Sequence, residues 1–249
     1  MQHKPITDLD HTDIHVIDDI FPHDVLNDLA AYAMNSHRWG FNNYTNGTNA
    51  WAMGVVGYPE GYGGGEEFEE QAKQDWEDRK KELPAFEEMW NIIKKKSPVG
   101  KLLLDKPTRS LFNGHVSAHG NYAHTDAPSM PGHGVAGMPI YTHIICLNKT
   151  WSIDTGGATE FYNIERTEII KSVIPQYGRM IVFDGRIPHA GKPPCKFYNG
   201  LRLNLAWQCK VSDIDYTDSI ETEPYREYLK DSLKRGSWGI KKKDKKNEI

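Results

Sequence analysis

The chain has 249 residues, of which 30 are basic and 34 acidic, so its formal net charge is −4. This balance gives no general positive field and argues against a nucleic-acid partner. The first residues form no apolar leader, no stretch approaches the roughly 18 apolar residues of a membrane span, and the three cysteines lack a CxxC spacing. We therefore expect a cytoplasmic protein with reduced thiols and no membrane partner.

The first hundred residues are expected to form one strand followed mainly by helices. Ile14–Ile17 is an apolar run typical of a short strand, and residues 24–35 carry apolar side chains at helical spacing. Residues 41–65 are rich in Asn, Gly and aromatic residues, which predicts a loop with one or two strands. Residues 66–96 are dense in Glu and Lys with an apolar stripe, which predicts one or two amphipathic helices broken near Pro84.

From Lys101 onward the chain changes to short apolar runs separated by Gly and Pro. The candidate strands cover residues 102–104, 110–117, 141–147, 158–161, 180–183 and 201–209. Short strands at this density are typical of a β-sandwich or barrel. We expect one domain over residues 1–240, with the strand and helices at 14–100, a β core at about 101–210, and a solvated basic tail at 241–249.

A candidate metal site lies in the β region. In an extended chain the side chains of residues i and i+2 project to the same side, so His124 and Asp126 can bind one ion. His189, after an apolar strand and an Asp-Gly turn, is a candidate third ligand. Two imidazoles and one carboxylate are the ligand set of non-haem Fe(II) oxygenases. The HxD spacing alone is weak, because His11-Thr12-Asp13 repeats it near the N-terminus.

Arg202 is a second unusual residue, because it lies inside a predicted core strand. The leucines and tryptophan that alternate with it share the other face of that strand: Leu201, Leu203, Leu205 and Trp207. A buried guanidinium needs a partner, because it cannot lose its proton. A structural ion pair and the carboxylate of a bound small acid are about equally compatible with this pattern.

Taken in order, these motifs resemble the prolyl 4-hydroxylase-like branch of the Fe(II)/2-oxoglutarate-dependent dioxygenase superfamily. The matching stretches are His124-Thr125-Asp126, residues 144–148, Gly156-Gly157 to Tyr162, residues 178–190 and Leu201 to Ala206. The resemblance covers most of residues 14–210. It implies a mainly β fold with flanking α-helices and a double-stranded β-helix (jelly-roll) core.

The resemblance also implies the cofactors and their ligands. His124, Asp126 and His189 would bind Fe(II), and Arg202 would hold the far carboxylate of the co-substrate 2-oxoglutarate. Arg202 stands where many prolyl hydroxylases have Lys, and the tyrosines that often contact the co-substrate are absent at Asn121 and near Cys146. Candidates for the other co-substrate contacts are Tyr122, Tyr141, His143 and Asn204.

The expected activity is dioxygen-dependent hydroxylation of an unactivated C–H bond, with release of succinate and CO2; desaturation or cyclisation also fits. The substrate would be a small molecule, an amino acid or a peptidyl residue, and the oligomeric state stays open. The alternatives are a non-catalytic jelly-roll module and a cupin-type dioxygenase that uses no keto acid.

Residues 127–139 are either a lid or a simple connection, and the aromatic residues at 39–65 either line the substrate or only pack. Arg186 either reaches an acidic substrate or lies on the surface.

Overall fold

The computed structural model describes residues 4, 8–45, 48–57, 66–117, 119, 121–126 and 140–211. The predicted basic tail at 241–249, the loop at 127–139, and Tyr62 lie outside these residues. Within the described part, no helix is long and apolar enough to cross a membrane.

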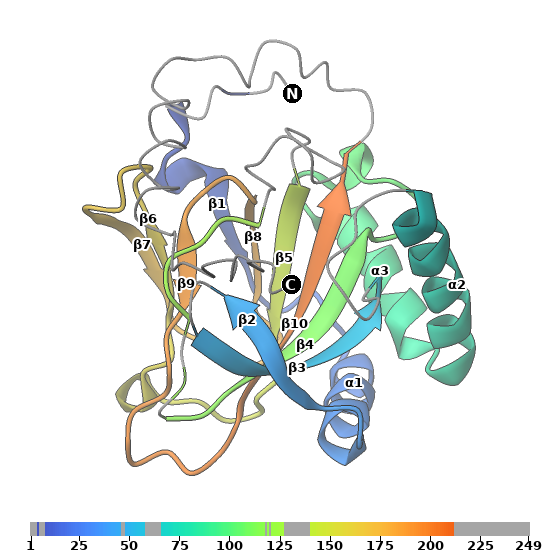
Figure 1. The fold of residues 1–249 in the computed structure, drawn as a ribbon, viewed down its shortest axis with the longest axis horizontal. Helices are drawn as coiled ribbons and strands as arrows, with labels where there is room; N and C mark the ends of the chain where they lie inside the picture. Colours follow the sequence, from blue (N-terminus) through green and yellow to red (C-terminus); the bar gives the residue numbers. More distant parts are fainter. Residues whose placement is uncertain are drawn as a thin grey trace, which may run out of the picture.

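The centre of the fold is a seven-stranded sheet in the order β1-β8-β5-β10-β4-β3-β2. Every pair of neighbours in it is antiparallel. Its strands are β1 (Ile14–Ile17), β2 (Gly40–Thr45), β3 (Thr48–Val56), β4 (Arg109–His115), β5 (Ile140–Cys146), β8 (Met180–Asp184) and β10 (Arg202–Lys210). The long β10 lies between β4 and β5, so its residues have partners on both sides (Figure 1).

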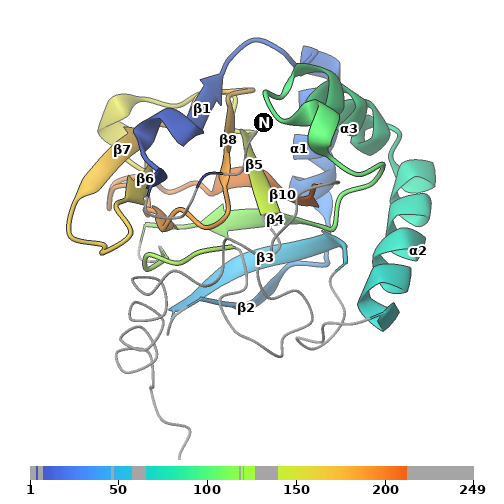
Figure 2. The ribbon, with the colours of Figure 1, turned by 90° about the horizontal axis from the view of Figure 1, so that it is seen from above.

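A smaller antiparallel sheet has the order β7-β6-β9. It consists of β6 (Thr159–Tyr162), β7 (Ile169–Val173) and β9 (His189–Gly191). Figure 2 shows β6 and β7 on one side of the seven-stranded sheet and the helices on the other. Two β layers with helices outside one of them form the jelly-roll architecture, in agreement with the expected fold class.

Three helices cover the outer face of the large sheet: α1 (His23–Asn35), α2 (Glu66–Glu82) and α3 (Ala85–Lys96). α1 follows Pro22 and α3 follows Pro84, and proline is favoured at helix starts because its missing N–H is not needed there. The predicted break near Pro84 is thus confirmed. Short 3-10 helices cover His11–Asp13, Gly100–Leu102 and Ile153–Thr155.

The two faces of the large sheet have different surroundings, and β10 shows the division. Leu203, Leu205 and Trp207 join the large apolar cluster beneath the helices, where Trp207 stacks on Trp90 with 5.6 Å between ring centroids. The alternate residues of β10 face the small sheet. The space between the two sheets is therefore where β10 presents its polar side chains.

The elements differ from the sequence predictions in two respects. Residues 102–104 form no strand, because a 3-10 turn ends at Leu102 and Leu103 makes only an isolated bridge to Val211. β7 and β9 were not predicted. The one or two strands predicted within residues 41–65 are confirmed, because β2 and β3 form an antiparallel pair there.

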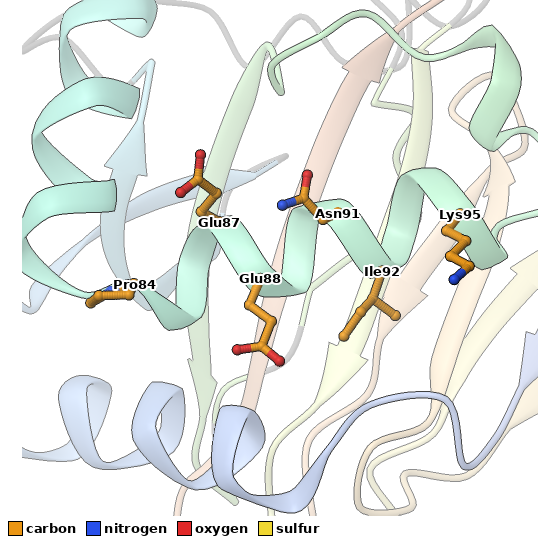
Figure 3. A pocket seen from close by; sticks show the side chains of 6 residues that line it. All are labelled: Pro84, Glu87, Glu88, Asn91, Ile92 and Lys95. Atoms are coloured by element: carbon orange, nitrogen blue, oxygen red, sulfur yellow. The ribbon is translucent and has the colours of Figure 1, made fainter.

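An open hollow of about 400 Å³ lies along α3, lined by Pro84, Glu87, Glu88, Asn91, Ile92 and Lys95. In Figure 3 Glu88 and Ile92 point toward α1, which packs beside α3. The hollow is on the helical side of the large sheet, away from the space between the sheets.

Candidate metal and anion site

The segment that carries His124 and Asp126 is fixed to the strand that carries His189. The backbone N–H of His124 donates to the carbonyl of His189 over 2.9 Å, and the reverse bond is 2.8 Å long. The N–H of Asp126 donates to the carbonyl of Gly185 over 2.8 Å. Segments far apart in the sequence are therefore held side by side by main-chain bonds, which position their side chains as a set.

The three side chains converge as the sequence predicted. One potential ligand atom from each of His124, Asp126 and His189 lies within 4.8 Å of the others. Nε2 of His124 is 3.8 Å from Oδ1 of Asp126, and Nε2 of His189 is 3.6 Å from Oδ2. This cluster of two imidazoles and one carboxylate has the donor types and spacing that a divalent ion requires.

Backbone carbonyls orient both imidazoles for metal binding. Nδ1 of His124 lies 3.0 Å from the carbonyl oxygen of Tyr122, and Nδ1 of His189 lies 3.0 Å from that of Ile187. A carbonyl can only accept, so each Nδ1 carries the proton and each Nε2 keeps its lone pair. The two lone pairs are those nearest Asp126, which fits a shared metal ion.

Burial and charge favour the ligand forms of these groups. Burial lowers the pKa of His189 to about 4, although the carboxylate of Asp126 opposes this shift. Burial alone would raise the pKa of Asp126, but His189, His124 and a hydrogen bond from Thr142 outweigh it and lower the pKa overall. A neutral imidazole and an ionised carboxylate are the states that bind a metal ion.

Arg202 is enclosed in the same space between the sheets. Its side chain is 2% exposed and donates to the carbonyl of Gly157 over 2.6 Å and to Oγ1 of Thr159 over 2.8 Å. Its third contact is with Nδ1 of His115, at 3.1 Å. Among the described residues no carboxylate pairs with Arg202, so the structural ion pair that the sequence left open is not found there.

His115 is the third contact of Arg202 and was missed by the sequence analysis. Arginine can only donate, so Nδ1 of His115 accepts from Arg202 and the ring proton is on Nε2. Burial and the charge of Arg202 lower the pKa of His115 to about 3, which keeps the ring neutral. Its Nε2 is buried and has no hydrogen-bond partner in the described part of the chain. A cation and an unpartnered donor side by side are suited to an anionic ligand.

Gly157 and Gly191 leave space for the side chains around Arg202. Gly157 has a φ of +69°, and a Cβ there would lie 2.8 Å from Trp151 and 3.1 Å from Arg202. A Cβ at Gly191 would lie 2.7 Å from the ring of His115. Side chains at these positions would therefore collide with Trp151, Arg202 or His115.

The remaining predicted co-substrate contacts are divided between the two faces of the sheet. Asn204 is 4% exposed, lies on the Arg202 face and accepts a 3.4 Å hydrogen bond from Asn113. Tyr141 and His143 lie on the opposite face, where Tyr141 packs against the helical core and Nε2 of His143 contacts Oγ of Ser97 at 2.9 Å. The structure does not bring these two to the site.

Tyr122 and Arg186 differ in how far they are buried. The side chain of Tyr122 is 63% exposed, although its carbonyl orients His124. Arg186 is buried and paired with Asp184 at 2.7 Å, so it is not the surface residue that was one of its two expected roles.

Known proteins resemble this chain in fold but not in sequence. No family model matches the chain, and no curated protein matches it. Solved structures do match: the fold is that of a 2OG-Fe(II) oxygenase family oxidoreductase from Burkholderia pseudomallei, with a TM-score of 0.51 and 11% identity over 80% of this chain and 85% of that one.

Prolyl hydroxylases have the same fold. The prolyl-4-hydroxylase of Pseudomonas putida matches with a TM-score of 0.52 and 17% identity, over 80% of this chain and 92% of that one. A prolyl hydroxylase from Trichoplax adhaerens, in complex with a hypoxia inducible factor peptide fragment, has a TM-score of 0.51 and 13% identity, over 80% and 84%. The expected resemblance to the prolyl 4-hydroxylase-like branch is therefore confirmed at the level of the fold.

Proposed function

We propose that the chain is a non-haem Fe(II) dioxygenase that uses 2-oxoglutarate and hydroxylates a C–H bond of a small-molecule, amino-acid or peptidyl substrate. The observation that carries this proposal is the buried guanidinium of Arg202, which lies beside β9, the strand that contains His189 of the metal cluster. A buried cation without an anionic side chain is costly unless a ligand supplies the charge. We assign that ligand to the keto acid.

Three side chains would bind the iron. His124 and His189 would hold iron through Nε2, and Asp126 through its carboxylate, because their other atoms are engaged with the backbone or with Thr142. Iron, when bound, supplies the activation of dioxygen that couples loss of CO2 from 2-oxoglutarate to substrate hydroxylation. Three protein ligands would leave the ion open to the keto acid and to dioxygen.

Arg202 would bind the far carboxylate of 2-oxoglutarate. Thr159 and the carbonyl of Gly157 hold the guanidinium in one orientation, so little side-chain freedom is lost when the acid binds. The Nε2–H of His115 would donate to the same carboxylate, and Asn204 is positioned for a further polar contact. Tyr122 is assigned no contact, because its side chain points largely to solvent.

Apolar side chains separate the reacting centre from water. Phe183 packs on the ring of His189 with 4.5 Å between centroids, and Phe161 packs on Phe183 at 4.9 Å. Exclusion of water strengthens the electrostatic contacts of the bound acid. It would also protect the bound reactants from side reactions.

The substrate class is inferred from a protein of the same fold. The Trichoplax prolyl hydroxylase binds a peptide fragment, which favours a peptidyl substrate here over a free metabolite.

A cupin-type dioxygenase that uses no keto acid would leave Arg202 without an anionic partner. The division into one domain at 1–240 and a basic tail at 241–249 stays a prediction.

The proposal is tested by anaerobic addition of Fe(II) and then 2-oxoglutarate to the purified protein. We expect a visible metal-to-ligand charge-transfer band that requires both additions, and release of succinate when oxygen is admitted. A protein that gives the band but no succinate with any peptide or amino acid would be the non-catalytic alternative. Absence of both the band and 2-oxoglutarate binding would contradict the proposal.

A further inference from the structure

We propose that Thr142 is a positioning residue that keeps Asp126 a monodentate metal ligand and so preserves the coordination position that dioxygen needs. This inference rests on the proposed function. Oγ1 of Thr142 donates a 2.6 Å hydrogen bond to Oδ2 of Asp126. No role for Thr142 follows from the iron-ligand motif itself.

The hydroxyl of Thr142 is held rigidly by the large sheet. Thr142 lies in the middle of β5, opposite Gln208 of β10 and Phe183 of β8, and is 1% exposed. Its β-branched side chain has few rotamers, and its alternation with His143 places it on the face toward the small sheet. Oγ1 is therefore a fixed donor aimed at Asp126.

Asp126, in contrast, lies outside the strands. Its backbone is tied through one bond to the carbonyl of Gly185. The orientation of its carboxylate plane about the side-chain bonds therefore depends on what the two oxygens contact. That carboxylate accepts a hydrogen bond from Thr142 at Oδ2, lies 3.6 and 3.8 Å from the two imidazoles, and is also within the electrostatic influence of Arg109.

The number of open metal positions depends on how many oxygens of Asp126 bind. An octahedral ion held by two imidazoles and one oxygen keeps three positions, two for the keto acid and one for dioxygen. If both oxygens chelated, the keto acid would fill the last two and none would be left. A hydrogen bond on Oδ2 fixes the carboxylate plane and opposes the rotation that chelation requires, as outer ligands of metal sites commonly do.

A structural role for the hydroxyl is the competing explanation. A buried threonine must satisfy its O–H, and Asp126 is a good acceptor whether or not a metal binds. The two explanations differ in what Thr142→Val does. A structural role predicts general loss of the site, whereas the positioning role predicts loss of the dioxygen position alone.

The experiment uses the Fe(II)-loaded protein without oxygen, with 2-oxoglutarate and then nitric oxide as the dioxygen surrogate. The variants are Thr142→Val, which removes the donor, and Thr142→Ser, which keeps it. Ser97→Ala is the matched control, because it removes a buried, hydrogen-bonded hydroxyl on the other face of β5. If Thr142→Val does not fold, as judged by circular dichroism, Thr142→Ala replaces it.

We expect Thr142→Val to keep the charge-transfer band of bound 2-oxoglutarate but to bind nitric oxide about tenfold or more weakly, measured by electron paramagnetic resonance. Thr142→Ser and Ser97→Ala should match the wild type in both. Wild-type nitric oxide affinity in Thr142→Val, or loss of the band together with nitric oxide binding, would overturn the role of Thr142. Absence of the band in the wild type would instead overturn the proposed function, and this inference with it.

Discussion

Nη1 of Arg202 donates a 3.1 Å hydrogen bond to Nδ1 of His115, so a buried cation has a neutral imidazole as its neighbour. The bond leaves the ring proton of His115 on the opposite nitrogen, where it is buried without a described partner. The pair thus presents a fixed charge and a fixed neutral donor to whatever anion enters.

Removal of the guanidinium should weaken co-substrate binding more than any other change in this pocket. Arg202→Ala is expected to cost about 2–5 kcal/mol in 2-oxoglutarate affinity, because a desolvated charge-assisted contact is lost. Calorimetry or the charge-transfer titration measures it. Arg38→Ala, which removes an exposed arginine, should leave the affinity unchanged. Equal affinity in Arg202→Ala and the wild type would exclude Arg202 from the site.

The two HxD sequences allow a matched test of the metal site. Asp126→Ala and His189→Ala should each abolish Fe(II)-dependent succinate release and weaken Fe(II) binding severely, because one of three ligands is lost. His11→Ala changes the histidine of the other copy, which is exposed in a 3-10 helix, and should have no effect. Turnover at the wild-type rate in Asp126→Ala would refute the assignment.

Alanine variants of Gly156 and Gly157 distinguish the effect of backbone strain from the effect of a contact with Arg202. Both have positive φ, +68° and +69°, so an alanine at either position strains the backbone. At Gly156 the nearest atom to the new Cβ is 3.8 Å away, whereas at Gly157 the Cβ meets Trp151 and Arg202. We expect both variants to lower the melting temperature, but only Gly157→Ala to reduce 2-oxoglutarate affinity. Equal affinities in the two variants would show that the contact with Arg202 is unimportant.

Stability should fall in mild acid because of a histidine outside the candidate site. Burial lowers the pKa of His143 to about 3, well below its value of about 6.5 in an unfolded chain. The unfolded state therefore binds the proton first, and stability is lost as pH falls from about 6.5 toward 3. By pH 5 the loss is about 2 kcal/mol for this one group.

Urea unfolding at pH 7 and pH 5 measures this loss. His143→Gln, which cannot titrate, should have the shallower dependence on pH. A slope equal to that of the wild type would mean that His143 is protonated without penalty in the folded protein.

Trp207 should dominate the packing of the helices on the large sheet. It is fully buried and contacts Trp76, Phe86 and Trp90, so Trp207→Ala should cost about 3–5 kcal/mol in the free energy of unfolding. Phe197→Ala, at a side chain that is 80% exposed, should cost almost nothing. Denaturant titration of the two variants compares them directly, and similar midpoints would contradict the assigned core.

The positions of most strands and the residues of the candidate metal cluster could be predicted, because they depend on local alternation and on short sequence motifs. The choice between the two faces of β5 could not. Tyr141 and His143 were candidates by residue type, yet Thr142 and Cys146 are the residues on the face of the sheet that carries Arg202. Which residues of β5 lie on that face is decided by the pairing of β5 with β10. The co-substrate position expected near Cys146 could still have indicated Thr142, because residues 142 and 146 lie on the same face of a strand.

Other elements gave too weak a sequence signal. β9 has only three residues, and β7 has a mixed burial pattern without regular alternation, so neither shows a strand period. His115 is the last residue of β4 and has no motif beside it in the sequence. Its role depends on the pairing of β4 with β10, which places it opposite Arg202. Contacts between residues this distant in sequence follow from the tertiary fold.

The candidate metal ligands connect the two sheets of the fold. His189 belongs to the small sheet through β9, while Asp126 is bound to the large sheet through Thr142. An ion held by both residues would connect the two sheets. Loading with metal should therefore slow hydrogen exchange along β9 and β5 together, and chelation should release both layers at once.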